Sequence, residues 1–166
     1  LSPRLIDRAW VISLPQPNSP RITRFDEYYD PIPMGILHKL FDIDGDTISL
    51  DTVTESILKE VFDLSREKLN TNVSPRTELA IRKYCKVGGG LFESSRSGVD
   101  GPIVAIDNAI AQKILPKVQG SGSVYKKKLE EFNEALVRNN LLKSSEILIR
   151  IMQRGDRNMQ YYQYFA

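Results

Sequence analysis

The chain has 166 residues, of which 41% are hydrophobic and 27% charged, a composition typical of globular proteins rather than disordered ones. A chain of this length can bury roughly 70% of the surface of its unfolded state, so a real core is feasible. Cys85 is the only cysteine, which excludes an intramolecular disulfide and fits a cytoplasmic location. The net charge of +2 does not demand nucleic acid or an anionic membrane as a partner. No apolar run approaches the roughly 20 residues of a membrane helix, so no membrane partner is expected.

The N-terminal segment combines a short helix, a short strand and a proline-rich connection. Residues 3–8 have the character of a helix end, and Ala9–Leu14 is rich in strand-forming residues until Pro15 ends it. Residues 15–33 contain five of the nine prolines and are expected to be a linker. One short strand cannot form a stable sheet alone. We therefore expect its partners upstream, in a longer protein.

From residue 34 onward, apolar residues recur at spacings of three and four, the pattern of helices with one buried face. A short helix is expected first, around Ile36–Phe41. The next follows Thr52, which with Glu55 resembles a capping box, in which two side chains bind free N–H groups of the first turn. The apolar residues of this helix that are expected in the core are Val53, Ile57, Leu58, Val61, Phe62 and Leu69.

Ser74 and Pro75 mark the start of another helix, because serine caps free N–H groups and proline suits the first helical position. That helix is expected to run to about Val87, end at Gly88–Gly90, and be followed by a loop up to Pro102. Apolar spacing indicates three further helices. They are centred on Ile103–Ile114, Tyr125–Leu136 and Ile147–Met152.

These elements predict a mainly helical bundle with one short N-terminal strand. The final stretch, Met159–Ala166, contains three tyrosines and a phenylalanine and is too apolar for a free tail, so we expect it to dock. The chain divides into an N-terminal fragment at residues 1–14, the linker at 15–33, and a helical domain at 34–166. No internal repeat or low-complexity tract is present.

Four blocks across the chain occur in the order of a known family. They are L-S-P-R-L-I-D-R-A at 1–9, V-S-P-R-T at 73–77, I-D at 106–107 with Q-K-I-L-P-K-V-Q-G at 112–120, and a closing block from 151 to 165 that ends in N-M-Q-Y-Y-Q-Y-F. Together they resemble the last part of AAA+ ATPases of the dynein-related, McrB-like branch. The resemblance implies that the bundle is the AAA+ lid and that the strand is left over from the α/β core.

The resemblance also implies roles for particular arginines. Arg8 matches the arginine finger, which reaches the γ-phosphate bound by a neighbouring subunit, and Arg4 is a candidate second basic contact. Arg76 matches sensor 2, which contacts the nucleotide of its own subunit. The chemistry is sound, because a guanidinium is always cationic and offers a planar donor fork to phosphate oxygens. Arg76 would also stand at a helix N-terminus, where N–H groups favour phosphate.

The same resemblance implies a larger assembly. The complete protein would bind ATP or GTP with Mg²⁺ and form a homo-oligomeric ring, expected to be a hexamer, with a nuclease and DNA as possible partners. This chain has no G-x-x-x-x-G-K-[ST] motif and no apolar strand that ends in an Asp-Glu pair. The phosphate-binding loop and magnesium ligands are thus expected in a missing N-terminal core, and this piece should not hydrolyse nucleotide by itself.

A second interpretation is a non-catalytic helical module for protein interaction or scaffolding, in which Arg8 and Arg76 are ordinary surface residues. An independent enzyme is disfavoured, because no set of acid, base and nucleophile can be assembled from the sequence. The two hypotheses differ in whether nucleotide hydrolysis depends on these arginines.

Other chemical features have simpler explanations. Asp42–Asp46 is acidic but lacks the glycine and glutamate spacing of a calcium loop, so no metal site is expected. His38 has no evident partners, and Cys85 is expected to be a buried packing residue. Lys126–Lys128 is followed directly by acidic residues such as Glu130, which favours a solvated helix over a nucleic-acid surface.

Overall fold

A computed structural model gives the structure of residues 6, 8–12, 48–71, 73–95 and 100–165. In these segments the chain forms five α-helices, one short 3-10 helix and two short strands, which confirms the mainly helical architecture. The elements in chain order are α3 (Thr52–Leu69), α4 (Pro75–Ser95), α5 (Gly101–Lys113), η1 (Leu115–Lys117), β1 (Gln119–Ser121), α6 (Gly122–Arg138), α7 (Leu142–Arg157) and β2 (Tyr161–Gln163). The short helix expected around Ile36–Phe41 lies outside the described residues.

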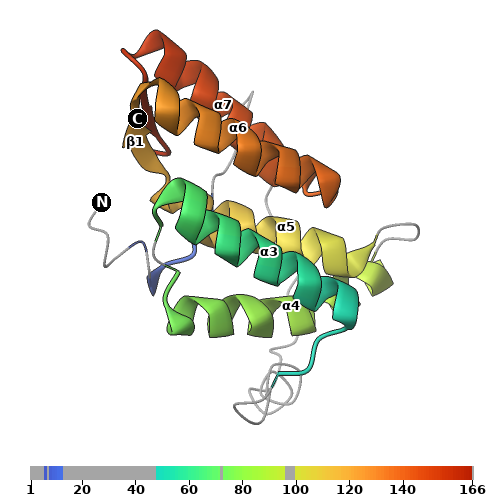
Figure 1. Cartoon of the computed structure of the whole chain (residues 1–166). Coiled ribbons are helices and arrows are strands. Elements are labelled where there is room, and N and C mark those ends of the chain that lie inside the picture. Colours follow the sequence, from blue (N-terminus) through green and yellow to red (C-terminus); the bar gives the residue numbers. More distant parts are fainter. Residues whose placement is uncertain (1–5, 7, 13–47, 72, 96–99, 166) are drawn as a thin grey trace, which may run out of the picture.

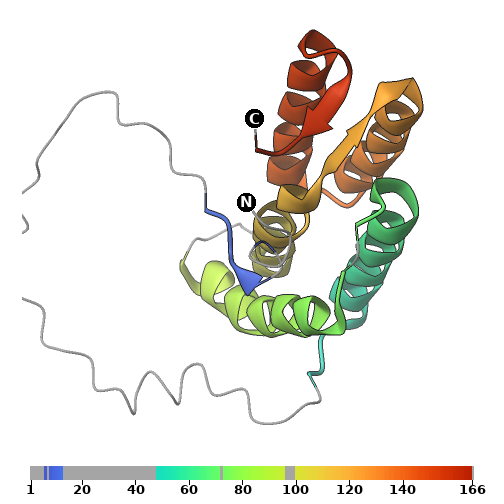
Figure 2. The same ribbon diagram turned by 90° about the vertical axis from the view of Figure 1, so that its left-hand side faces the viewer.

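The helices form stacked layers around one core. Figure 1 shows α6 and α7 on one side, α3 and α5 in the middle, and α4 on the opposite side. In the perpendicular view of Figure 2, α4 crosses beneath α3 and α5. Helices from each of these layers contribute to the core. Its largest fully buried side chains include Phe62, Leu58, Ile81, Ile106, Ile110, Leu129, Phe132 and, from β2, Tyr162. No described helix is long and apolar enough to cross a membrane.

The small sheet lies in a different place from the strand predicted at the N-terminus. β1 and β2 pair antiparallel, with Gln119 opposite Gln163. The described part of the expected strand, residues 9–12, is not in a strand; the rest of it lies outside the described residues. Val11 N–H instead donates to the carbonyl of Gln112 at 3.2 Å. No strand lies beside this segment among the described residues. It contacts α4 through Trp10 and α5 through Val11 instead.

The start of α3 differs by one residue from the expected capping box. Asp51, rather than Thr52, is the N-cap, and its carboxylate accepts a hydrogen bond from the N–H of Thr54 at 2.9 Å. Val53 was expected in the core but is 66% exposed, because this start of the helix turns its side chain to solvent. The remaining apolar residues predicted for this helix are buried: Ile57, Leu58, Val61, Phe62 and Leu69.

The expectation that α4 ends at Gly88–Gly90 is wrong, because the helix continues to Ser95. Gly88 and Gly89 are both buried. A Cβ on Gly88 would lie 3.4 Å from the Cβ of Ala105, and one on Gly89 would lie 3.6 Å from Pro102. Both distances are ordinary van der Waals contacts, so this face of α4 packs against α5 and has room for a methyl group. Glycine inside a helix costs about 1 kcal/mol relative to alanine, and contact with α5 offsets that cost.

Candidate functional site

Arg76 is the second residue of α4, and its side chain is exposed. The predicted cap is present: the Ser74 hydroxyl accepts from the N–H of Thr77 at 3.3 Å, and the Ser74 carbonyl accepts from the N–H of Glu78 at 3.0 Å. Arg76 makes no ion pair with any residue that the structure describes. Its guanidinium therefore stands at the positive end of a capped helix, and no carboxylate of the described residues neutralises it.

The neighbouring arginines of α3 and α4 behave differently. Arg82 pairs with Glu55, and Arg66 pairs with Glu78. Both pairs connect α3 to α4 and hold the guanidinium groups against the protein surface. Among the arginines at this end of the bundle, Arg76 is thus the one left available for an anionic ligand within the described residues.

Arg8 is exposed in the N-terminal segment, which packs on α4 and α5 (Figure 2). The ring of Trp10 lies 4.9 Å from that of Tyr84 in α4, measured between centroids. The ammonium of Lys113, in the last turn of α5, lies 5.0 Å from the Trp10 ring centroid, within the range of a cation–π contact. No hydrogen bond or ion pair between described residues joins Arg8 to Arg76, and Arg4 lies outside the described residues.

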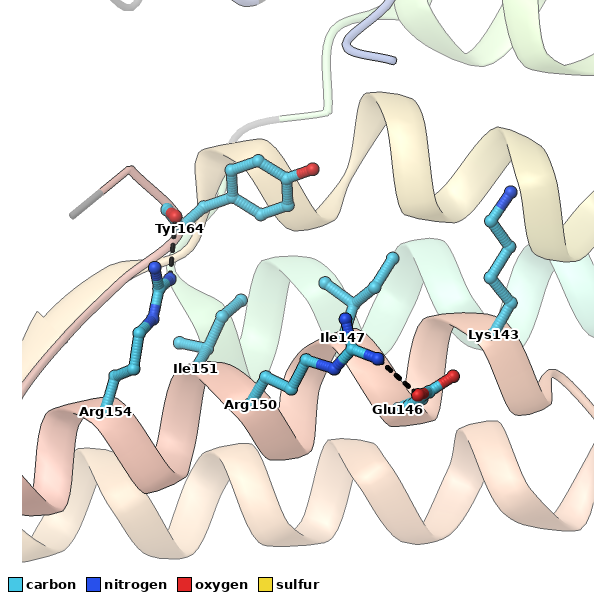
Figure 3. Close-up of a pocket in the computed structure, with 7 residues that line it drawn as sticks. All are labelled: Lys143, Glu146, Ile147, Arg150, Ile151, Arg154 and Tyr164. Atoms are coloured by element: carbon cyan, nitrogen blue, oxygen red, sulfur yellow. Dashed lines mark hydrogen bonds and ion pairs between the residues drawn. The ribbon is translucent and has the colours of Figure 1, made fainter. Parts of the chain in front are cut away.

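A second feature is a cavity of about 440 Å³ beside α7. Figure 3 shows the side chains that line it; those of Ile147, Ile151 and Arg154 rise from α7 on the side facing α5. We name it the α7 groove. Its lining consists of three cations, one carboxylate, two isoleucines and a tyrosine: Lys143, Arg150, Arg154, Glu146, Ile147, Ile151 and Tyr164.

Each cation of the α7 groove is held by a specific partner. Lys143 donates to the amide oxygen of Asn108 at 2.6 Å, and Arg150 pairs with Glu146 at 2.5 Å. Arg154 donates to the carbonyls of Gln163 and Tyr164, at 3.1 Å and 2.8 Å, as the dashed line in Figure 3 shows for Tyr164. The cations are therefore oriented, and among the described residues only Arg150 is paired with a carboxylate.

Asp107 fixes the start of α7 against α5. Its two carboxylate oxygens accept hydrogen bonds from the N–H groups of Lys143 and Ser144, both at 2.8 Å. The Ser144 hydroxyl in turn donates to the Asp107 carbonyl at 2.9 Å. Leu141, at the N-cap position, has no side-chain oxygen to do this. Asp107 thus caps α7 from another helix and sets the position of the α7 groove.

The α7 groove was not predicted from the sequence. Lys143, Arg150 and Arg154 are separated by seven and four residues, which places them on one face of a helix. That signal was present, but the contribution of Tyr164 depends on how the C-terminal strand folds back. The predicted docking of the C-terminal stretch is confirmed at Tyr162, which is fully buried.

The described residues contain no group of three or more His, Cys, Asp or Glu side chains placed to hold a metal ion. His38 and the acidic run Asp42–Asp46 lie outside them. Cys85 is buried in α4, and its burial raises the pKa of the thiol to about 12. A thiol in this environment is a poor nucleophile, as expected for a packing residue.

Comparison with known protein families gives one match, over residues 36–161, to the family described as a domain of unknown function, DUF8727. The chain belongs to the DUF8727 family. The DUF8727 match includes Arg76, Asp107 and the α7 residues of the groove, whereas Arg8 precedes it and Tyr164 follows it. No curated protein and no solved structure matches the chain.

Proposed function

We propose that this chain is the helical lid and arginine-finger segment of a ring-forming AAA+ nucleoside triphosphatase of the McrB-like branch. The observation that carries the proposal is the state of Arg76. It is exposed, unpaired among the described residues, and placed in the first turn of a helix capped by Ser74. A cation at a helix N-terminus is unfavourable unless an anion comes to it, because the helix dipole is positive there.

A phosphate group would relieve this conflict. The free N–H groups of the first turn and the guanidinium of Arg76 would both donate to its oxygens. In the proposed enzyme, Arg76 contacts the nucleotide of its own subunit. Binding of ATP or GTP with Mg²⁺ would require the phosphate-binding loop of an N-terminal core, which this chain lacks.

The packing of the N-terminal segment supports a role for Arg8. Trp10 lies against Tyr84 and Lys113. Because Trp10 is two residues after Arg8, these contacts attach the segment that carries Arg8 to the proposed lid. In a ring, expected to be a hexamer, Arg8 would extend toward the nucleotide of the neighbouring subunit. Movement of the lid would then be transmitted to the arginine finger through Trp10.

The test is nucleotide hydrolysis by the complete protein that contains this chain. Arg8→Ala should lower the hydrolysis rate by about 10³–10⁵ while sparing nucleotide binding. Arg76→Ala should weaken both binding and hydrolysis. Arg157→Ala is the matched control, since Arg157 is an exposed arginine on the last turn of α7 with no ion pair among the described residues. Hydrolysis that is indifferent to both Arg8→Ala and Arg76→Ala would contradict the proposal.

The α7 groove favours a second candidate function, a helical protein-interaction module. It is a concave surface with an apolar floor and oriented cations. Packing of the hydrophobic core does not require such a surface. The two functions are compatible, because a cytoplasmic McrB-like motor would also dock a partner such as a nuclease that acts on DNA. They are separable by experiment, since Arg76 and the groove lie on different helices.

A further inference from the structure

We propose that the α7 groove is a docking site for an acidic amphipathic helix of another protein. The proposal does not depend on nucleotide binding. It rests on the shape of the groove, on the chemistry of its floor, and on the charge of its rim.

The dimensions of the groove suit a short helix. Lys143 and Arg154 mark its two ends on α7, and at 1.5 Å per residue their separation is about 16 Å, or three turns. Ile147 lies between them, one turn before Ile151. A partner helix of about 12 residues would therefore contact the groove along its whole length.

The floor and rim select the kind of partner. Ile147 and the Tyr164 ring, both half-buried, offer apolar surface above the buried Ile151, and burial raises the pKa of Tyr164. Aliphatic side chains on one face of a partner helix would cover this surface. Among the described lining residues, three cations against the single carboxylate of Glu146 leave a net positive rim, which complements carboxylates on the flanks of that helix.

The groove favours a peptide over nucleic acid. Arg154 is held by two backbone carbonyls and Lys143 by Asn108; these acceptors are neutral, so both cations keep fixed positions and their charge for the carboxylates of a partner helix. Among the described residues the lining offers one aromatic ring, that of Tyr164, whereas single-stranded nucleic acid stacks successive bases on several aromatic side chains.

The experiment is fluorescence anisotropy with the 166-residue chain and a labelled model peptide. The peptide is a helix of about 12 residues with leucines at spacings of three and four and glutamates on the flanks. A second peptide carries lysine in place of every glutamate. The test variant is Lys143→Glu/Arg150→Glu. The matched control is Lys127→Glu/Arg157→Glu, which makes the same change in charge at exposed residues outside the groove.

The expected result is binding of the acidic peptide, loss of binding for the basic peptide, and weakening by about tenfold or more in the test variant but less than about twofold in the control. Helical content is checked by circular dichroism. If charge reversal disturbs it, Lys143→Gln/Arg150→Gln gives the same test with a smaller expected loss.

Three outcomes would overturn the proposal. They are no binding of the acidic peptide, equal binding of both peptides, and binding that the groove substitutions leave unchanged. In the first case, the same variants are tested for binding of a single-stranded oligonucleotide and for self-association in analytical ultracentrifugation, and one of these could depend on the groove. That result would assign the surface to nucleic acid or to a second copy.

Discussion

Gly155 lies directly against the ring of Tyr162, so closely that a methyl group on the glycine would overlap the ring carbons. Tyr162, in β2, is fully buried, and its hydroxyl donates to Asp156 at 2.9 Å. The last turn of α7 and the returning strand therefore share one packing contact. The neighbouring Tyr125 ring covers Gly120 in the same way. The Gly155–Tyr162 contact holds β2 to α7, and the Gly120–Tyr125 contact holds β1 to α6.

Gly155→Ala should destabilise the protein by about 1–3 kcal/mol, because the buried ring must move to make room for the methyl group. The measurement is the free energy of unfolding in urea. Gly90→Ala is the control in another helix: a Cβ there would meet no atom within 4 Å, so it should be neutral or stabilise by about 0.5–1 kcal/mol. Equal effects of the two substitutions would contradict the packing described.

Asp107→Ala should cost about 1–3 kcal/mol, because it leaves two N–H groups of the first turn of α7 without their acceptor. Asp107→Asn retains one acceptor oxygen and should cost less. Asp63→Ala serves as the control, since Asp63 is an exposed carboxylate with one surface ion pair, to Arg66, and should change stability by less than about 1 kcal/mol. Hydrogen exchange of the first turn of α7 should rise in the Asp107 variants alone.

Glu60 connects α3 to the end of α6. A hydrogen bond from Asn139, at 2.9 Å, and then the pair with Arg138 hold the pKa of Glu60 below its ordinary value of 4.5. The folded carboxyl thus binds its proton only at lower pH than the unfolded one. The stabilisation is present above the ordinary value and is lost as pH falls through the folded pKa.

Unfolding in urea should therefore become easier on going from about pH 6 to about pH 3. Glu60→Gln should lower stability by about 0.5 kcal/mol at the higher pH and reduce the pH dependence. Glu134→Gln, at an exposed carboxyl of α6 with no ion pair among the described residues, should leave the pH dependence unchanged. A Glu60→Gln variant with the wild-type pH profile would show that the Asn139 and Arg138 contacts do not matter in solution.

Cys85 should resist alkylation in the folded protein. Burial raises the pKa of its thiol to about 12, so the reactive thiolate is scarce at about pH 8 and shielded from reagent. Because it is the only cysteine, labelling by iodoacetamide can be followed by mass alone. We expect labelling of Cys85 in urea to be complete at a time when the native protein is still mostly unlabelled. Equal rates in the two conditions would contradict the packing of α4.

The sequence was most informative where local chemistry decides the structure. The Ser74-Pro75 helix start and the buried face of α3 are confirmed, because caps and apolar spacing act over three or four residues. The prediction that α4 ends at Gly88–Gly90 was wrong, because glycine is tolerated inside a helix that packs on a neighbour, and Gly88 and Gly89 are buried against Ala105 and Pro102 of α5. The strand predicted at Ala9–Leu14 is not formed in its described part, residues 9–12. A strand needs a second strand beside it, and the local sequence does not report whether one is present.

The candidate sites show the same limit. Arg76 at the mouth of α4 was predictable from its position after Ser74 and Pro75. The α7 groove was not predicted. Its cations are neighbours by helical spacing, but Tyr164 joins them only because the chain folds back after α7. The capping of α7 by Asp107 joins residues 37 positions apart, and no local pattern reports such a contact.

The most direct test of the central claim is titration of a fluorescent nucleoside triphosphate into the complete protein and its Arg76→Ala variant. A charged hydrogen bond to phosphate is worth about 1.5–3 kcal/mol, so the dissociation constant should rise about 10- to 100-fold. Arg157→Ala should bind as the wild type does. An unchanged dissociation constant in Arg76→Ala, with the helical content intact, would contradict the assignment of this helix as a nucleotide-sensing lid.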